Sequence, residues 1–205
     1  VKITTSSITD RALNNNAAAV LQIPSRSGGG SSPAALPATG FAPNVVTTLP
    51  LQPHEMTYAP TDLVLDVPSL GIKIPIVGVA KKNGAWDLTW LGKQAGWLAG
   101  TAFPSWNGNS VLTGHVYDAN GLPGPFVNLN KLKFGDKIIV HAFGQQYTFE
   151  VRTNQVVDPN DASALKHEDK SWLTLITCKE FNAKTNTYKK RVVVRAVLVS
   201  VVSDK

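Results

Sequence analysis

The chain has 205 residues, 43% hydrophobic and 17% charged, which suits one buried core with an extension. Lysine and arginine outnumber aspartate and glutamate by 20 to 14, giving a formal net charge of +6. The basic residues are scattered and do not interleave with aromatic ones, which argues against a nucleic-acid surface. A single cysteine excludes an intramolecular disulfide, and the lack of clustered Cys and His residues argues against structural zinc.

The first part of the chain differs in composition from the rest. Residues 1–57 are rich in proline, serine, glycine and alanine, and such a stretch buries too little apolar area to offset the entropy of ordering. We therefore expect a flexible linker with a short helix over Thr9–Ile23, followed by one domain over 58–205. No stretch has the 18 or so consecutive apolar residues of a membrane span. Because the sequence begins with Val1, we expect a membrane anchor or signal to lie upstream.

Residues 58–205 show the pattern of a mainly β domain. Short apolar runs, many of them alternating and bounded by Gly, Pro, Asn or Asp, predict about eight strands with few helices. Such regularly spaced strands suggest a sandwich or a barrel. We expect short helices at most over 126–132 and 156–165, and a loop-rich region around the tryptophans at 86–106. The clearest strand runs are 62–67, 72–77, 110–115, 135–143, 147–152, 172–178 and 189–199.

Three residues of chemical interest end or begin predicted strands. Cys178 ends the run Trp172-Leu-Thr-Leu-Ile-Thr-Cys, His115 ends Ser110-Val-Leu-Thr-Gly-His, and Arg191 lies at the start of a third strand. A lone cysteine is more often a small buried hydrophobe than a nucleophile. A histidine and an arginine at neighbouring strand ends favour the second interpretation, because a thiolate needs a nearby cation near neutral pH.

These motifs resemble those of the sortases, cysteine transpeptidases of mainly Gram-positive cell surfaces. The resemblance covers roughly residues 60–202 and implies a closed eight-stranded β-barrel. It implies that Cys178 attacks the Thr carbonyl of an LPxTG-like peptide and that His115 protonates the departing amine. Arg191, which is always charged, would bind an oxyanion or a substrate carbonyl. A thioacyl-enzyme would then be resolved by an amine of a wall precursor or a pilin lysine.

Further candidates are less specific. Thr177 and Trp97 are candidate substrate-binding residues, although a tryptophan in such a region more often fills the core beneath loops. Some sortases bind calcium, but the carboxylates at Asp158, Asp161, Glu168 and Asp169 do not have the spacing of an EF-hand loop, and we interpret them as solvated. We expect no cofactor.

The predicted linker contains Leu36-Pro37-Ala38-Thr39-Gly40, which matches the pentapeptide that many sortases cut between Thr and Gly. A short match can arise by chance in a linker of this composition. A sorting signal is also expected near a C-terminus, before an apolar span, whereas here the predicted domain follows. An ordinary wall-anchored substrate is therefore not expected, and a regulatory or self-docking role, a substrate role and a chance match all stay open. One hypothesis is that the motif occupies the cleft in cis or from a neighbouring molecule.

Two other functional classes compete with the sortase interpretation. In papain-like proteases the cysteine precedes the histidine and heads a helix, the reverse of the order here. A non-catalytic cell-surface β-domain, whose LPATG is itself a recognition element, is the alternative from a different class. If the protein is a sortase, its partners are LPxTG-bearing surface proteins and an amine acceptor, and its place is the extracellular face of the membrane.

Overall fold

In the computed structural model, residues 35–53 and 57–204 are described. The helix expected over Thr9–Ile23 lies outside the described residues. Within the described part, no helix is both long enough and apolar enough to cross a membrane.

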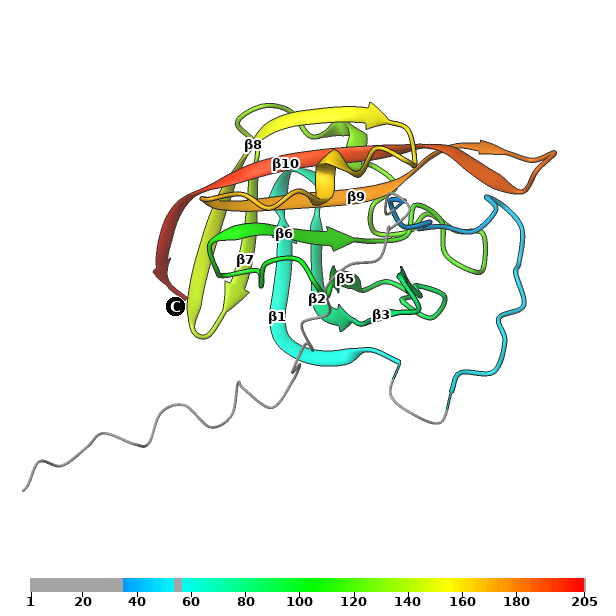
Figure 1. Ribbon diagram of the computed structural model, residues 1–205, viewed down its shortest axis with the longest axis horizontal. Helices are drawn as coiled ribbons and strands as arrows, with labels where there is room; N and C mark the ends of the chain where they lie inside the picture. Colours follow the sequence, from blue (N-terminus) through cyan, green and yellow to red (C-terminus); the bar gives the residue numbers. More distant parts are fainter. Residues whose placement is uncertain (1–34, 54–56, 205) are drawn as a thin grey trace, which may run out of the picture. The chain divides into compact units, whose positions relative to one another are not determined.

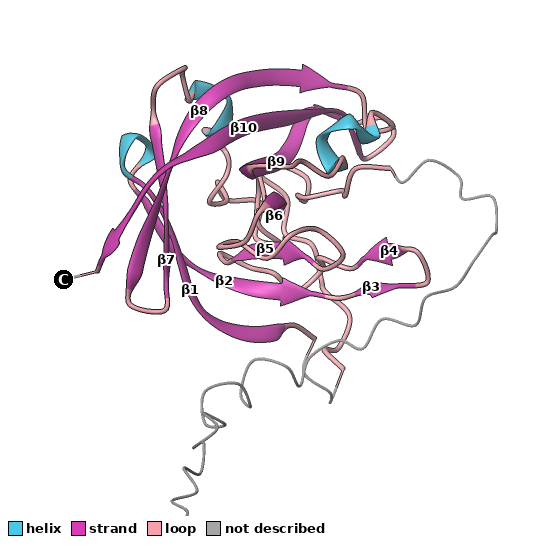
Figure 2. Cartoon of the chain, turned by 60° about the vertical axis from the view of Figure 1, so that its left-hand side comes forward, coloured by secondary structure: helices cyan, strands magenta, loops and turns pink. Residues whose placement is uncertain are grey.

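Eight strands form a closed barrel, which confirms the predicted fold class (Figure 1). Around the barrel the order is β1-β2-β5-β6-β9-β10-β8-β7. Figure 2 shows that the described helices are short turns outside the barrel wall. The barrel strands are β1 (Ala59–Val67), β2 (Ile72–Val79), β5 (Ala95–Leu98), β6 (Gly108–Thr113), β7 (Lys137–Ala142), β8 (Gln145–Val157), β9 (Ser171–Asn182) and β10 (Thr187–Ser203). The remaining elements are the two-stranded β3 (Lys81–Lys82) and β4 (Ala85–Trp86) and the 3₁₀ turns η1 (Pro68–Leu70), η2 (Leu129–Lys131) and η3 (Ala162–Leu165).

Alternating side chains explain why these segments form a barrel. In β1, Leu63, Leu65 and Val67 point inward and are at most 2% exposed, while their neighbours are more accessible. The hairpin between β7 and β8 turns at Phe143 and Gly144, whose φ angles of 53° and 70° suit the right-handed twist of the strands. Buried aliphatic and aromatic side chains fill the barrel, and a second apolar cluster lies around Val79, Leu98 and Ile176.

The parallel pairing of β6 with β9 positions the candidate site. Thr113 is opposite Ile176 in this pair, so two further residues along each strand lead to His115 and Cys178 at the same end of the barrel. Parallel neighbours place their carboxyl ends at one edge, which explains why residues 63 positions apart in sequence meet there.

The prediction that Cys178 and Arg191 lie at strand ends was wrong. β9 continues to Asn182 and β10 begins at Thr187, so both residues lie inside a long hairpin that extends past the rest of the barrel (Figure 1). Residues 179–190 are mostly polar and lack an apolar period, because this ribbon is largely open to solvent. The strand pattern is therefore lost there even though the backbone ladder continues.

The loop expected around the tryptophans contains a barrel strand. β5 pairs in parallel with β2 and antiparallel with β6, through the short run Ala95-Gly-Trp-Leu98. Small residues give this segment little β propensity, and packing between two stronger strands determines its conformation. At Gly96, a Cβ atom would lie 2.8 Å from a methyl of Val79, so a larger residue would disturb the packing against β2.

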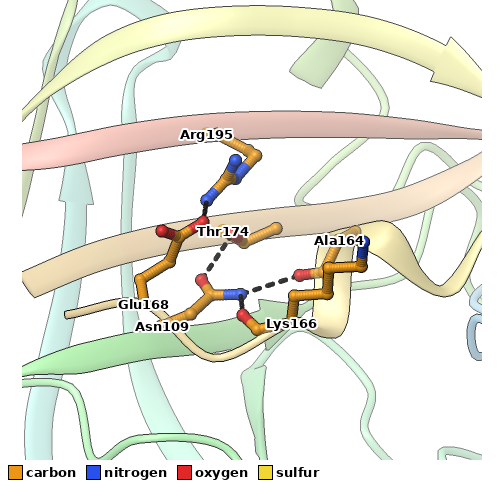
Figure 3. A network of polar contacts seen from close by, with 6 residues as sticks. All are labelled: Asn109, Ala164, Lys166, Glu168, Thr174 and Arg195. Atoms are coloured by element: carbon orange, nitrogen blue, oxygen red, sulfur yellow. Dashed lines mark hydrogen bonds and ion pairs between the residues drawn. The ribbon is translucent and has the colours of Figure 1, made fainter. Parts of the chain in front are cut away.

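A buried polar network ties η3 to the barrel (Figure 3). The Asn109 amide on β6 donates to the carbonyl oxygens of Ala164 at 2.8 Å and Lys166 at 3.0 Å, and it accepts from the Thr174 hydroxyl at 2.7 Å. An ion pair between Arg195 and Glu168 lies beside it. Ala164 belongs to the second apolar cluster, so Asn109 fixes one wall of that cluster.

Replacing Asn109 with alanine is expected to lower the free energy of unfolding by about 3 kcal/mol, because it leaves the buried Ala164 carbonyl, the buried Thr174 hydroxyl and the partly buried Lys166 carbonyl without their partner. Chemical denaturation monitored by tryptophan fluorescence measures the change. Asn107→Ala is the matched control: this asparagine is exposed and contacts the Ser171 hydroxyl, and its loss is expected to cost less than about 0.5 kcal/mol. Equal effects of the two substitutions would contradict the structural role of the network.

Candidate active site

Cys178, Arg191 and His115 come together at one end of the barrel. Cys178 and Arg191 are directly opposite each other in the β9–β10 ladder, and His115 follows the end of β6. All three are buried, with exposures of 1%, 5% and 2%. The structure thus brings together the three residues that the sequence singled out.

The backbone around His115 is held by close contacts. The Thr177 hydroxyl, next to Cys178, donates to the Gly114 carbonyl at 2.8 Å and so fixes the end of β6 against β9. At Gly124 a Cβ atom would lie 2.3 Å from the His115 carbonyl oxygen, so the loop can pass this closely only with glycine. The hydroxyl of Thr177, a predicted substrate-binding residue, therefore holds the backbone next to His115, and its part in substrate binding stays a prediction.

The segment containing the LPATG motif lies in this site. The Thr39 amide donates to Cys178 Sγ at 3.0 Å, and Arg191 Nε donates to the Pro37 carbonyl oxygen at 2.8 Å. The Leu36 amide donates to the Pro159 carbonyl oxygen at 2.7 Å, in the loop before η3. In Figure 1 the same segment, in blue, runs near the end of β6 and alongside β9. The expected linker segment thus contacts the residues that the resemblance assigns to catalysis.

Burial along the motif varies residue by residue. Leu36 is 3% exposed within the second apolar cluster, Pro37 is buried and Thr39 is fully buried, whereas Ala38 is exposed. Gly40 has φ of 150°, and a Cβ atom there would lie 2.5 Å from a methyl of Val116. The site therefore encloses the Leu, Pro and Thr positions, leaves the third position open, and has no room for a side chain at the fifth.

On both sides of Gly40 the segment is hydrogen-bonded to residues that the sequence did not single out. The Val116 amide donates to the Thr39 carbonyl oxygen at 3.2 Å, and the Phe41 amide donates to the Tyr117 carbonyl oxygen at 3.1 Å. The Tyr188 hydroxyl donates to the Phe41 carbonyl oxygen at 2.7 Å, and the Phe41 ring packs on His115 with centroids 5.2 Å apart. Contacts made by backbone groups cannot be recognised in a sequence, because every residue has these groups. Tyr188 is the one residue here with a visible signal, as an aromatic residue three positions before Arg191.

Desolvation dominates the electrostatics of the site. Burial raises the pKa of the Cys178 thiol above its usual value, and the charge of Arg191 opposes this rise. Burial lowers the pKa of His115, although the Leu88 backbone and the Asp118 carboxylate act in the opposite direction. With the segment in place, the site therefore favours a neutral thiol beside a neutral imidazole.

The Arg191 side chain is buried without a carboxylate partner among the described residues. Besides Pro37 it donates through Nη1 to the carbonyl oxygens of Tyr188 at 3.2 Å and Lys190 at 3.0 Å. These bonds fix the guanidinium plane, while its positive charge remains uncompensated beside Cys178. Such a charge suits a thiolate or a developing oxyanion.

A pocket of about 290 Å³ has Cys178 in its wall, and Leu36 is not among its lining residues. The wall also includes Pro43 and the aromatic residues Tyr117, Phe181 and Tyr188, with Asn130 and Glu180 adding polar groups. Glu180 has φ of 60°, a left-handed conformation in which a non-glycine residue is strained. A second reactant could approach a thioester at Cys178 through this pocket.

The other candidates lie apart from this set. The Trp97 indole donates to the Ala102 carbonyl oxygen at 2.9 Å, and its ring packs edge-on against Phe103 at 5.2 Å. These contacts agree with a core-filling role, and a part in substrate binding stays a prediction. Glu168 pairs with Arg195, and Asp158 with Lys190 at 3.1 Å. Among the described residues, no group of three or more His, Cys, Asp or Glu side chains could hold a metal.

Known proteins resemble this chain in fold and in sequence. The chain is 29% identical to sortase D of Bacillus subtilis over 132 residues. This aligned part covers 63% of this chain and 60% of that relative. Sortase C-1 of Actinomyces oris superposes with a TM-score of 0.57 at 30% identity, over 72% of this chain and 78% of that one. The pilus-related sortase C of Group B Streptococcus superposes with a TM-score of 0.56 at 28% identity, over 71% of this chain and 70% of that one. The family model of the sortase domain matches residues 65–199, so this chain belongs to the sortase family.

Proposed function

We propose that this protein is a transpeptidase that cuts LPxTG-type sorting signals between Thr and Gly and transfers the acyl part to an amine. The observation that carries the proposal is the position of the LPATG segment, with its Thr39 amide on Cys178 Sγ and its Pro37 carbonyl on Arg191. A sorting peptide bound in the same way would have its Thr carbonyl next to the nucleophile.

The roles of the residues follow from their chemistry. The Cys178 thiolate attacks the Thr carbonyl carbon and forms a thioester, and His115 gives a proton to the departing glycine amine. Arg191 holds the substrate through the Pro carbonyl, and its charge stabilises both the thiolate and the tetrahedral oxyanion. An amine then attacks the thioester and restores the thiol.

The partners that fit this reaction are surface proteins carrying an LPxTG-like signal, at the extracellular face of the membrane. The acceptor is an amine of a lipid-linked wall precursor or a pilin lysine. The pocket beside Cys178 has room for such an amine, and the exposed Glu180 carboxylate on its wall would attract the positive charge.

Incubating the full chain carrying Leu36→Asp with an LPATG peptide and triglycine tests the proposal, because this substitution is expected to free the cleft. We expect mass spectrometry to show the peptide joined to triglycine after Thr, and no product when Cys178→Ala is added. Slow alkylation of the thiol together with absence of product would instead favour a non-catalytic β-domain. A product that forms without Cys178 would contradict the mechanism.

A further inference from the structure

The structure holds both sides of one peptide bond of its own chain at the nucleophile. On the acyl side, Thr39 donates to Cys178 Sγ at 3.0 Å and accepts from the Val116 amide at 3.2 Å. On the amine side, Phe41 is bonded to the Tyr117 carbonyl oxygen at 3.1 Å and to the Tyr188 hydroxyl at 2.7 Å. The Thr39–Gly40 bond is therefore fixed between anchored neighbours.

The segment also meets the site in the manner of a substrate. It buries Leu36, Pro37 and Thr39 and exposes Ala38, the third position of the motif. The backbone at Gly40 approaches Val116 too closely for a Cβ atom. A segment serving as a plug could fill this space with any apolar residue. The glycine in fifth position, immediately after the bond to be cut, is the residue that a cleavable peptide requires at this approach.

We propose that the chain cuts itself in cis between Thr39 and Gly40, an inference that rests on the proposed function. Cys178 Sγ attacks the Thr39 carbonyl carbon, the Thr39–Gly40 C–N bond breaks, and the thiol proton passes through His115 to the Gly40 amine. Residues 1–39 are then held as a thioester on Cys178. An outside amine attacks this thioester, forms an amide with Thr39 and loses a proton as the thiol is restored; no oxidant or reductant is needed.

The position of the released amine determines when the cut becomes permanent. Gly40 remains covalently joined to the catalytic domain and is held near Cys178 through Phe41, so its effective concentration at the thioester is high and it can reform the original bond. A competing amine can approach through the pocket next to Cys178. We therefore expect the cut chain to accumulate when an outside amine is supplied.

The experiment follows the intact mass of the full chain with and without triglycine. We expect two products, a fragment beginning at Gly40 and residues 1–39 joined to triglycine, with a rate constant that is independent of chain concentration. Cys178→Ala is expected to remove both products. Gly40→Ala is expected to reduce them at least tenfold, and Leu51→Asp, at a position 96% exposed, to leave them unchanged.

A parallel reaction separates this inference from the proposed function, using the Leu36→Asp chain, an outside LPATG peptide and triglycine. If the outside peptide is joined to triglycine while the wild-type chain stays whole, self-cleavage is overturned and the proposed function stands. If neither reaction occurs, both are overturned. A rate constant for the cut that rises with chain concentration would show cleavage between molecules and overturn the cis proposal.

Discussion

Replacing Arg191 with lysine is expected to lower kcat/KM for an LPATG peptide about 100-fold, measured in chains that also carry Leu36→Asp. Lysine keeps the charge but loses the planar fork through which Arg191 binds the Pro37 carbonyl while two backbone carbonyls fix its orientation. Arg191 is also proposed to stabilise the tetrahedral oxyanion, and losing one oxyanion donor costs roughly 10²–10³ in rate. Because the bond to the Pro carbonyl also forms before reaction, we expect a rise in KM along with the fall in kcat.

Arg152→Lys is the matched control for this substitution. Arg152 lies on β8, is partly exposed and pairs with Glu150 at 2.6 Å, away from Cys178. We expect its kcat/KM to change less than about twofold, as for a surface ion pair. If Arg191→Lys were also nearly neutral, charge alone would account for the role of Arg191, and the proposed contact with the substrate carbonyl would be refuted.

The barrel could be predicted from the sequence where apolar residues alternate, as in β1, or form an unbroken buried run, as in β6. β5 and the outer half of the β9–β10 hairpin could not be predicted in the same way. Small residues in β5 and polar residues at 179–190 carry little strand signal, and their conformation depends on pairing with neighbouring strands. The wrong prediction for Cys178 and Arg191 therefore concerned only the positions at which β9 ends and β10 begins. The two residues still lie opposite each other in this hairpin.

The candidate site was predictable where chemistry is carried by residue type. Cys178, His115 and Arg191 could be selected because Cys178 and His115 end apolar runs, Arg191 begins one, and a thiol needs a nearby cation to act as a nucleophile near neutral pH. The Val116 amide and the Tyr117 carbonyl could not, since every residue has these groups and only tertiary structure gives them a partner. The motif at 36–40 was visible in the sequence, but its contact with Cys178 required the structure.

Substituting Leu36 with aspartate is expected to raise the alkylation rate of Cys178 by iodoacetamide about 100-fold at neutral pH. Burial of a leucine side chain contributes about 2–3 kcal/mol to holding the segment in the cleft, and a carboxylate in the same apolar cluster would be strongly unfavourable. Departure of the segment lets water reach Cys178, which removes the burial that raises its pKa, while Arg191 remains to stabilise the thiolate. The midpoint of the alkylation rate against pH should therefore move to lower pH.

Leu51→Asp makes the same chemical change in the same segment at a leucine that is 96% exposed. We expect its alkylation rate to match that of the wild-type chain, and because Cys178 is the sole cysteine, the mass of one adduct reports on this thiol alone. A 100-fold rise confined to Leu36→Asp, with an unchanged unfolding midpoint of the barrel, would mean that the segment controls access to the nucleophile. Equal rates in all three chains would mean that the thiol is accessible with the segment present, and would remove the basis for a self-docking role of the LPATG motif.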